Sequence, residues 1–238
     1  MSTALPRVNF FGIPISTYKL NIFLSICGIY LLGIFLTWYL TGIFKIPLPD
    51  DVALRSLSTA ILQTVCVIII PYFWAIKRLK FSLQDLGITT KKIGQSTLLG
   101  CSLYSLALAA FIYSSSDPLI SNHAIRTMEL ADASTLLLSM SIIAAGTDIA
   151  TRGFILFTLA KFTNLPLAIF LQNAAWFFGH VGEINLLQNA LGLWAAIGLT
   201  LILGILGDVI ALKTRNIVGL AIAHILLNVV LTFYIRSL

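Results

Sequence analysis

The stretch GTDIATRGFILF, residues 146–157, places an acid and a base close together inside an apolar segment. Asp148 and Arg152 are four residues apart, so a helix would put both side chains on one face. Charged side chains are costly in hydrocarbon, and they usually face the protein interior and pair with one another. The stretch therefore predicts a membrane helix with a polar interior face, which marks either a structural ion pair or a functional site.

The composition of the whole chain agrees with a membrane setting. Of its 238 residues, 58% are hydrophobic and only 10% are charged, whereas about 25% of the residues in a soluble domain are charged. The net charge of +6 does not indicate a nucleic-acid partner, because the basic residues lie in short segments between apolar runs. The three cysteines fall inside apolar runs and form no disulfide or CxxC zinc pattern. We therefore expect an all-α, polytopic integral protein of the lipid bilayer.

Seven apolar runs approach the roughly 20 residues that a membrane helix needs. They occupy about 20–44, 57–76, 95–114, 134–160, 165–181, 188–212 and 216–235. The fifth run is the shortest, and the longest polar loop, 114–134, is expected to carry a surface helix. We expect one structural unit, with N-terminal membrane helices and polar loops at 1–133 and a core at 134–238.

Lysine and arginine positions predict the orientation, because cytoplasmic loops are enriched in both residues. With seven spans, ten of these residues fall on the side of the N-terminus and four on the other side. The N-terminus is therefore expected to be cytoplasmic and the C-terminus exterior. The ten are Arg7, Lys19, Lys77, Arg78, Lys80, Lys91, Lys92, Lys161, Lys213 and Arg215, and the four are Lys45, Arg55, Arg126 and Arg236.

Five polar side chains on three predicted helices fall at similar depths. Counting about 1.5 Å per residue from the cytoplasmic helix ends, Arg152 and His224 lie roughly 12 Å deep. Asp148 and Asn228 lie roughly 18 Å deep by the same count, and His180 roughly 22 Å. His224 and Asn228 are four residues apart and share a face, as the charged pair does. We therefore expect the three helix faces to converge on one interior cavity.

Each polar group taken alone also has a simpler explanation. The charged pair alone is as consistent with a structural ion pair as with a site. A single histidine could lie at the outer headgroup level, and Asn228 could be a hydrogen bond between helices. Asp208 is interpreted as structural, because it lies near a predicted helix end within reach of Lys213 or Arg215.

Three short motifs follow one another in the second half of the chain: TDIATR (147–152), WFFGH (176–180) and HILLN (224–228). Their order and spacing resemble the Glu-Glu-x-x-x-Arg, aromatic-x-x-x-His and His-x-x-x-Asn motifs of the CPBP intramembrane proteases. This family is also called the CAAX-protease and bacteriocin-processing, or Abi, family. The resemblance covers roughly residues 134–235, the CPBP-like core. FSLQDLGI (81–88) is similar to a short cytoplasmic stretch found upstream in the family.

The resemblance implies an intramembrane peptidase, in which a glutamate activates water while histidines and an asparagine stabilise the oxyanion. It implies Asp148, Arg152, His180, His224 and Asn228 as the catalytic set. It also implies a divalent metal such as zinc, held by the two histidines, if the protein is active. The implied partners are a transmembrane peptide, a prenylated peptide or a membrane protein complex.

The chain departs from the family pattern in the first motif. Thr147 stands where the family has its base, and a threonine hydroxyl does not accept a proton near neutral pH. Asp148 keeps a carboxylate, but Arg152 is placed to neutralise it. We therefore expect an impaired or inactive protease-like protein that binds a membrane peptide or lipid-modified partner as a scaffold, assembly or immunity factor. The alternative is an active endopeptidase that uses Asp148 with His180 and His224. A small transporter is a third class, which is disfavoured because no inverted repeat is visible.

Overall fold

The computed structural model describes residues 7–10, 13–40, 51–115, 127–181, 184, 187–188 and 191–237. A short antiparallel hairpin, β1 (Arg7–Phe10) and β2 (Ile13–Ser16), precedes the first helix. The remaining elements are helical, so the prediction of an all-α polytopic membrane protein is confirmed. They are α1 (Thr17–Trp38), α2 (Val52–Thr64), the π-helix η2 (Val65–Ile69), α3 (Ile70–Arg78), α4 (Ile93–Ser115), α6 (Leu130–Asp148), the π-helix η3 (Ile149–Leu156), α7 (Phe157–Phe162), α8 (Leu165–Gly179), α10 (Leu193–Thr214) and α11 (Val218–Ser237).

Six helical rods in the described part of the chain are long and apolar enough to cross a membrane. They are α1, the continuous rod α2–η2–α3, α4, the continuous rod α6–η3–α7, α10 and α11. The fifth expected span, 165–181, corresponds to α8, which has 15 residues. At 1.5 Å per residue α8 is about 22 Å long, which is shorter than a hydrocarbon core of about 30 Å. Most of the surface helix expected at 114–134 lies outside the described residues.

Capping side chains start the helices where the sequence turns from polar to apolar. Asp51 begins α2 by accepting a hydrogen bond from the backbone N–H of Leu54 at 2.8 Å. Asn164 begins α8 in the same way through Leu167, also at 2.8 Å, with a proline in the first turn. Each cap satisfies one of the N–H groups that a helix start leaves unpaired.

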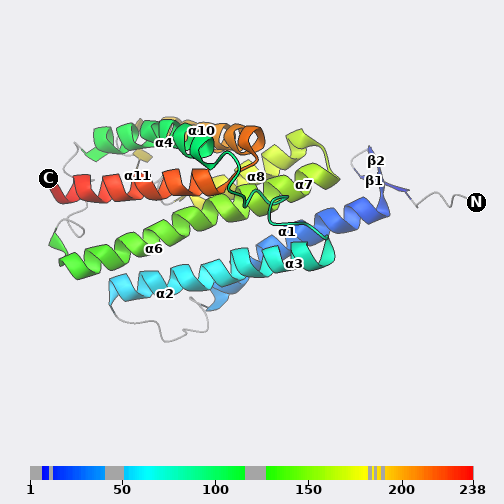
Figure 1. The fold of residues 1–238 in the computed structure, drawn as a ribbon, viewed down its shortest axis with the longest axis horizontal. Helices are drawn as coiled ribbons and strands as arrows, with labels where there is room; N and C mark the ends of the chain where they lie inside the picture. Colours follow the sequence, from blue (N-terminus) through cyan, green and yellow to red (C-terminus); the bar gives the residue numbers. More distant parts are fainter. Residues whose placement is uncertain are drawn as a thin grey trace, which may run out of the picture.

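The rod α6–η3–α7 runs through the middle of the bundle (Figure 1). It packs against α2 on one side and against α11 on the other, while α4 and α10 cover α11. α8 returns along η3 and packs against α10. The motif segment on this rod therefore contacts helices from both halves of the chain.

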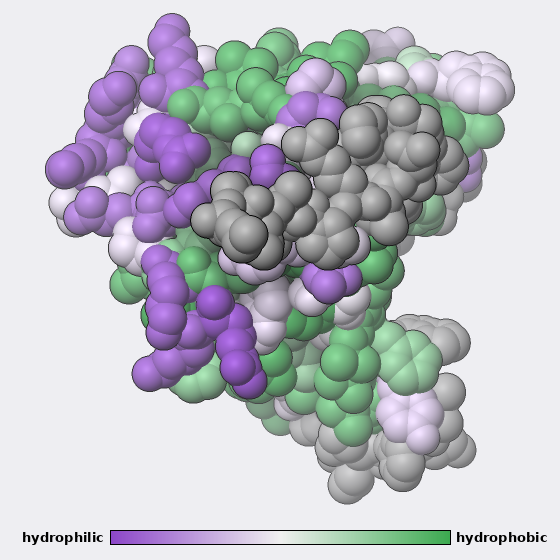
Figure 2. All heavy atoms as spheres, turned by 90° about the vertical axis from the view of Figure 1, so that its right-hand side faces the viewer, coloured by the Kyte–Doolittle hydropathy of each residue, from purple (hydrophilic) through white to green (hydrophobic). Residues whose placement is uncertain are grey.

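The basic segments meet at one end of the bundle, which lies on the right in Figure 1. The Lys161 ammonium lies 4.3 Å from the ring centroid of Phe81, and the Arg215 guanidinium lies 4.4 Å from that of Phe157. These contacts bring the loop after α3, the end of α7 and the end of α10 together, whereas Arg236 lies at the opposite end of α11. Figure 2 looks onto the basic end and shows hydrophilic side chains gathered there beside apolar flanks. Which end faces the cytoplasm stays a prediction.

Candidate functional site

The TDIATR motif lies where α6 passes into the π-helix η3. π-helical turns occur frequently at functional sites. The hydroxyl of Tyr72 on α3 donates to the backbone carbonyl of Ile149 at 2.9 Å. A Cβ atom at Gly153 would overlap with that hydroxyl, so the close approach of α3 requires glycine there. The contact anchors the first turn of η3, and this turn orients the charged residues of the motif.

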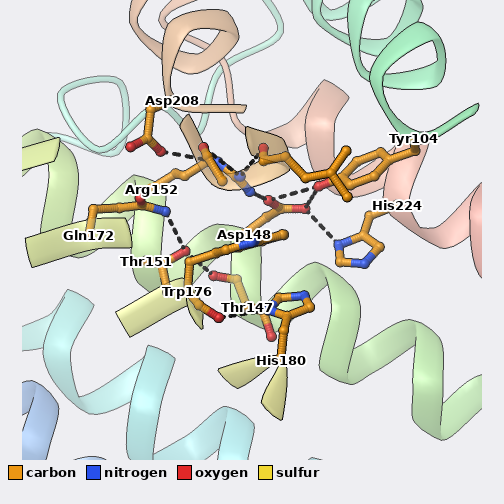
Figure 3. A network of polar contacts seen from close by, with 12 residues as sticks. Tyr104, Thr147, Asp148, Thr151, Arg152, Gln172, Trp176, His180, Asp208 and His224 are labelled. Carbon is orange, nitrogen blue, oxygen red and sulfur yellow. Dashed lines mark hydrogen bonds and ion pairs between the residues drawn. The ribbon is translucent and has the colours of Figure 1, made fainter. Parts of the chain in front are cut away.

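Asp148 is fully buried, and other side chains occupy both of its carboxylate oxygens. Arg152 forms an ion pair with Oδ1. The Tyr104 hydroxyl lies 3.3 Å from Oδ1 and 3.1 Å from Oδ2. His224 Nδ1 lies 3.1 Å from Oδ2. Three neighbours from α4, η3 and α11 therefore surround the carboxylate (Figure 3).

Arg152 is also fully buried, and its guanidinium group points at the backbone of α10. Nη2 donates to the carbonyl oxygens of Leu203 at 3.4 Å and Gly204 at 3.3 Å. A Cβ atom at Gly207 would overlap with the guanidinium group. Glycine at position 207 therefore creates the space in which the charge lies.

Asp208 faces this same guanidinium, which corrects the interpretation that it pairs with Lys213 or Arg215. It is fully buried, with Oδ1 3.4 Å from Arg152 Nε, and its Oδ2 accepts a hydrogen bond from Asn173 at 2.8 Å. Lys213 and Arg215 are exposed at the end of α10. Asp208 lies on the buried face of α10, less than two turns before the helix ends. Its partner is therefore a buried residue of another helix and not one of the basic residues close to it in the sequence.

The ring of Trp176 lies between Arg152 and His180. The guanidinium carbon of Arg152 is 4.0 Å from the Trp176 ring centroid, close enough for a cation–π contact. On the other side the rings of Trp176 and His180 stack with centroids 3.9 Å apart. The indole N–H donates to the carbonyl of Thr200 at 3.3 Å. The aromatic residue of the second motif therefore contacts the charge of the first motif.

The two histidines lie near each other, as the common depth of the motifs predicts. The rings of His180 and His224 are nearly parallel, with centroids 6.1 Å apart. His180 Nδ1 lies 2.8 Å from the carbonyl oxygen of Trp176. Asn228 lies apart from this group and donates to the carbonyl of Met140 on α6 at 3.2 Å. The structure therefore brings four of the five expected residues together, while Asn228 links α11 to α6.

The described side chains around the histidines do not by themselves form a zinc centre. Protein zinc sites use at least three protein ligands. Within the described parts of the chain, no group of three His, Cys, Asp or Glu side chains could hold a metal ion. The nearest carboxylate, Asp148, already contacts Arg152, Tyr104 and His224. Among the described residues, the metal-binding role that the family resemblance implies for the histidines therefore lacks a third ligand.

A cavity of about 670 Å³ lies on the other side of the motif helix. Residues of α1, α2, η2, α6, η3, α7 and α8 line it. Thr147 is one of them, together with Gly146 and Ala150, and its hydroxyl donates to the carbonyl of Ile143 at 2.9 Å. Asp148 is not among the described residues that line the cavity. The first and second positions of the family's Glu-Glu pair therefore face different surroundings.

Comparison with known proteins finds a family likeness in the second half of the chain. Residues 130–230 match the model of the family described as Rce1-like, type II CAAX prenyl endopeptidase. The match covers less than half of the chain, and over this part the chain is similar to the CPBP membrane proteases. The match begins at the start of α6 and includes all three motifs. No curated protein and no solved structure matches the chain.

The sequence alone did not indicate several side chains that complete the site. Asp208 carries a visible signal, because it is an acid within an otherwise apolar run. Asn173 and Gln172 are likewise buried polar residues in the apolar α8, and Gln172 lies 3.3 Å from the Thr151 hydroxyl. Tyr104 carries no such signal, because tyrosine is common in membrane helices and the residue lies outside the family motifs.

Proposed function

We propose that this CPBP protease-like protein no longer cleaves peptide bonds. In this proposal it holds a membrane peptide or lipid-modified partner in the cavity beside Thr147 and serves as a scaffold, assembly or immunity factor. The observation that carries the proposal is the arrangement of the first motif. The side chain that faces the cavity is an uncharged hydroxyl, and the carboxylate faces the other way.

Asp148 is poorly suited to act as a base. A general base must reach the proton that it removes, either directly or through one water molecule. The Asp148 oxygens instead contact Arg152, Tyr104 and His224, and the side chain has no exposed surface. A water molecule would have to displace one of these neighbours before the carboxylate could activate it.

Thr147 leaves the cavity without a replacement base. Its hydroxyl proton is already donated to Ile143, one turn earlier in α6. The lining otherwise consists mainly of aliphatic and aromatic side chains with a few uncharged polar groups, and it includes no Asp, Glu or His among the described residues. Such a cavity is suited to binding an apolar ligand rather than to activating water.

An active endopeptidase remains a second candidate because of one observation. His224 contacts Asp148 at 3.1 Å, and its ring lies near that of His180. An acid that orients a histidine is a common feature of hydrolytic sites. In this alternative Asp148 would act together with both histidines, which requires that water enter between the histidine rings and the carboxylate.

A direct assay of proteolysis tests the proposal. The purified full-length protein, Asp148→Asn and His180→Ala would be incubated in lipid vesicles with prenylated and transmembrane peptides, and products would be measured by mass spectrometry. We expect no turnover above a protein-free control for any of the three. Turnover by the wild type that disappears in both variants, without loss of folded protein, would establish the endopeptidase alternative.

A further inference from the structure

Two polar side chains in the cavity have no partner within the described parts of the chain. Tyr30 on α1 and Gln63 on α2 both line the cavity, and neither the phenol nor the amide forms a hydrogen bond with a described residue. Tyr30 is 92% buried, since only 8% of its surface is exposed. Unpaired polar groups are costly in an apolar environment, so a ligand that hydrogen-bonds to these two side chains would be stabilised in the cavity.

The other hydroxyls of the lining are already used. Thr64 donates to the carbonyl of Ala60 at 2.8 Å, and Thr147 donates to that of Ile143 at 2.9 Å. The Tyr30 hydroxyl and the Gln63 amide are therefore the donors that remain for a ligand. An amide carries two N–H bonds and one carbonyl oxygen, and a phenol can both donate and accept.

These two residues lie at the depth of the motif. Counting about 1.5 Å per residue from the basic end, Tyr30 lies roughly 20 Å from the start of α1. Gln63 lies roughly 22 Å from the end of α3, and Thr147 roughly 22 Å from the end of α7. A ligand that pairs with Tyr30 and Gln63 must therefore present polar groups near the middle of the membrane, next to the first motif.

The size of the cavity limits what can enter. A helix with its side chains is about 10–12 Å wide and rises about 5.4 Å per turn, so one turn fills roughly 420–610 Å³. The cavity, at about 670 Å³, holds little more than one such turn. A complete transmembrane helix does not fit, whereas a short stretch of one does.

The cavity reaches the lipid-facing surface between α1 and α8. Three lining residues there are largely exposed, namely Leu31 (62%) and Ile34 (43%) on α1 and Phe178 (73%) on α8. The apolar character of this edge fits entry from the bilayer. A segment that enters here and unwinds leaves up to about four N–H and four C=O groups unpaired, and lipid supplies no partners for them.

We propose that Tyr30 and Gln63 contact the ligand of this cavity and hydrogen-bond to the backbone of a locally unwound turn in a partner's transmembrane segment. The partner enters between α1 and α8, and its unwound turn lies beside Thr147. This inference rests on the proposed function in that it uses the same cavity, and it specifies the partner's chemistry as an interrupted transmembrane peptide.

Two synthetic peptides test this inference with the full-length protein in phosphatidylcholine nanodiscs. Both are fluorescent, lysine-flanked segments of about 20 apolar residues; one carries a central Gly-Pro interruption and the other does not. Fluorescence anisotropy measures their affinities. We expect the interrupted peptide to bind about threefold to tenfold more tightly, and Gln63→Leu and Tyr30→Phe each to reduce its affinity by about twofold to tenfold.

Thr59→Val on α2 is the matched control. Thr59 does not line the cavity, and its hydroxyl already donates to the carbonyl of Arg55 at 3.0 Å, so its replacement should leave both affinities unchanged. Gln63→Leu should also leave the thermal unfolding of the free protein unchanged or raise its midpoint. A structural role for the amide would instead lower the midpoint.

Several results would overturn the inference. They are equal affinity for the two peptides, no binding of either, unchanged binding in both cavity variants, or displacement of the interrupted peptide by a prenylated peptide that binds independently of Tyr30 and Gln63. Cleavage of the bound peptide is a separate outcome. It would refute the proposed loss of proteolysis but leave the roles of the two side chains intact if the variants still weaken binding.

Discussion

Thr147 and Asp148 are neighbours in the chain, yet their side chains lie in different parts of the molecule. Thr147 lines the cavity formed with α1, α2 and α8, and Asp148 contacts Arg152, Tyr104 and His224 on the other side of α6. Consecutive helical residues point about 100° apart, so one helix can serve two separate compartments. The departure from the resembled motif at position 147 therefore affects the cavity, whereas Asp148 pairs with Arg152 on the other side of the helix.

Asp148→Ala should lower the free energy of unfolding of the protein. Removal of one partner of a buried ion pair costs about 3–5 kcal/mol when the remaining charge is left uncompensated. Arg152 is fully buried and would keep Asp208, whose Oδ1 lies 3.4 Å from Nε, so we expect a loss of about 3 kcal/mol or less. Chemical unfolding in detergent micelles measures the change. Asp132→Asn, in the first turn of the same helix, serves as the control and should change the free energy of unfolding by less than about 1 kcal/mol. Equal stability of Asp148→Ala and the wild type would show that the ion pair does not stabilise the bundle.

Gly207→Ala should destabilise the protein because the added methyl group meets the guanidinium of Arg152. Overpacking of this kind costs about 1–3 kcal/mol. The same substitution at Gly198, also on α10, meets no atom within 4 Å and should be neutral or stabilise by up to about 1 kcal/mol. Thermal unfolding of both variants tests the difference. Similar unfolding midpoints for Gly207→Ala and Gly198→Ala would show that the Arg152 guanidinium does not lie against Gly207.

Thr147→Glu should introduce proteolytic activity if the histidines retain their roles. The new carboxylate would face the cavity, whereas Arg152 contacts the other side of the helix. A general base contributes about 10²–10⁴-fold to a rate, so turnover should exceed that of Thr147→Gln by about 100-fold or more. The peptide assay described above measures it. Equal rates for the two variants would show that more than the base has been lost.

Asn228→Leu should have a small effect. The side chain makes one hydrogen bond from α11 to the carbonyl of Met140, and such interhelical bonds contribute about 0.6 kcal/mol on average in membranes. Unfolding in micelles should show a loss of that order, with peptide binding in the cavity unchanged. A loss above about 2 kcal/mol, or weaker peptide binding, would place Asn228 in the site.

The stability of the loop between α3 and α4 should depend on pH through Asp85. The backbone N–H and the hydroxyl of Ser82 donate to its carboxylate at 2.8 and 2.7 Å, and they lower the pKa of Asp85 below its ordinary value. The stabilisation is therefore present above the unfolded-state pKa of about 3.9 and is lost as the pH falls through the lower folded-state pKa. The protection of residues 82–88 against hydrogen exchange, measured relative to the rate of the unprotected amide at each pH, should fall in acid. Asp85→Asn should remove most of this pH dependence, and an unchanged profile would contradict the assignment.

The apolar runs and the motif spacings were sufficient to predict much of this protein from its sequence. A membrane helix needs a long apolar segment, and residues four apart share a helix face, so both features are local in the chain. For that reason the polytopic helical class was predicted correctly. The structure also brings Asp148, Arg152, His180 and His224 together, but none of them lines the cavity beside Thr147.

Only the tertiary structure decided which groups meet across helices. Asp208 contacts Arg152 instead of the nearby basic residues, and Tyr104 contacts Asp148. The position of the cavity relative to Thr147 also depends on how helices from both halves of the chain pack. These contacts join residues tens of positions apart, and their geometry depends on helix rotation and packing, which a periodic sequence pattern does not specify.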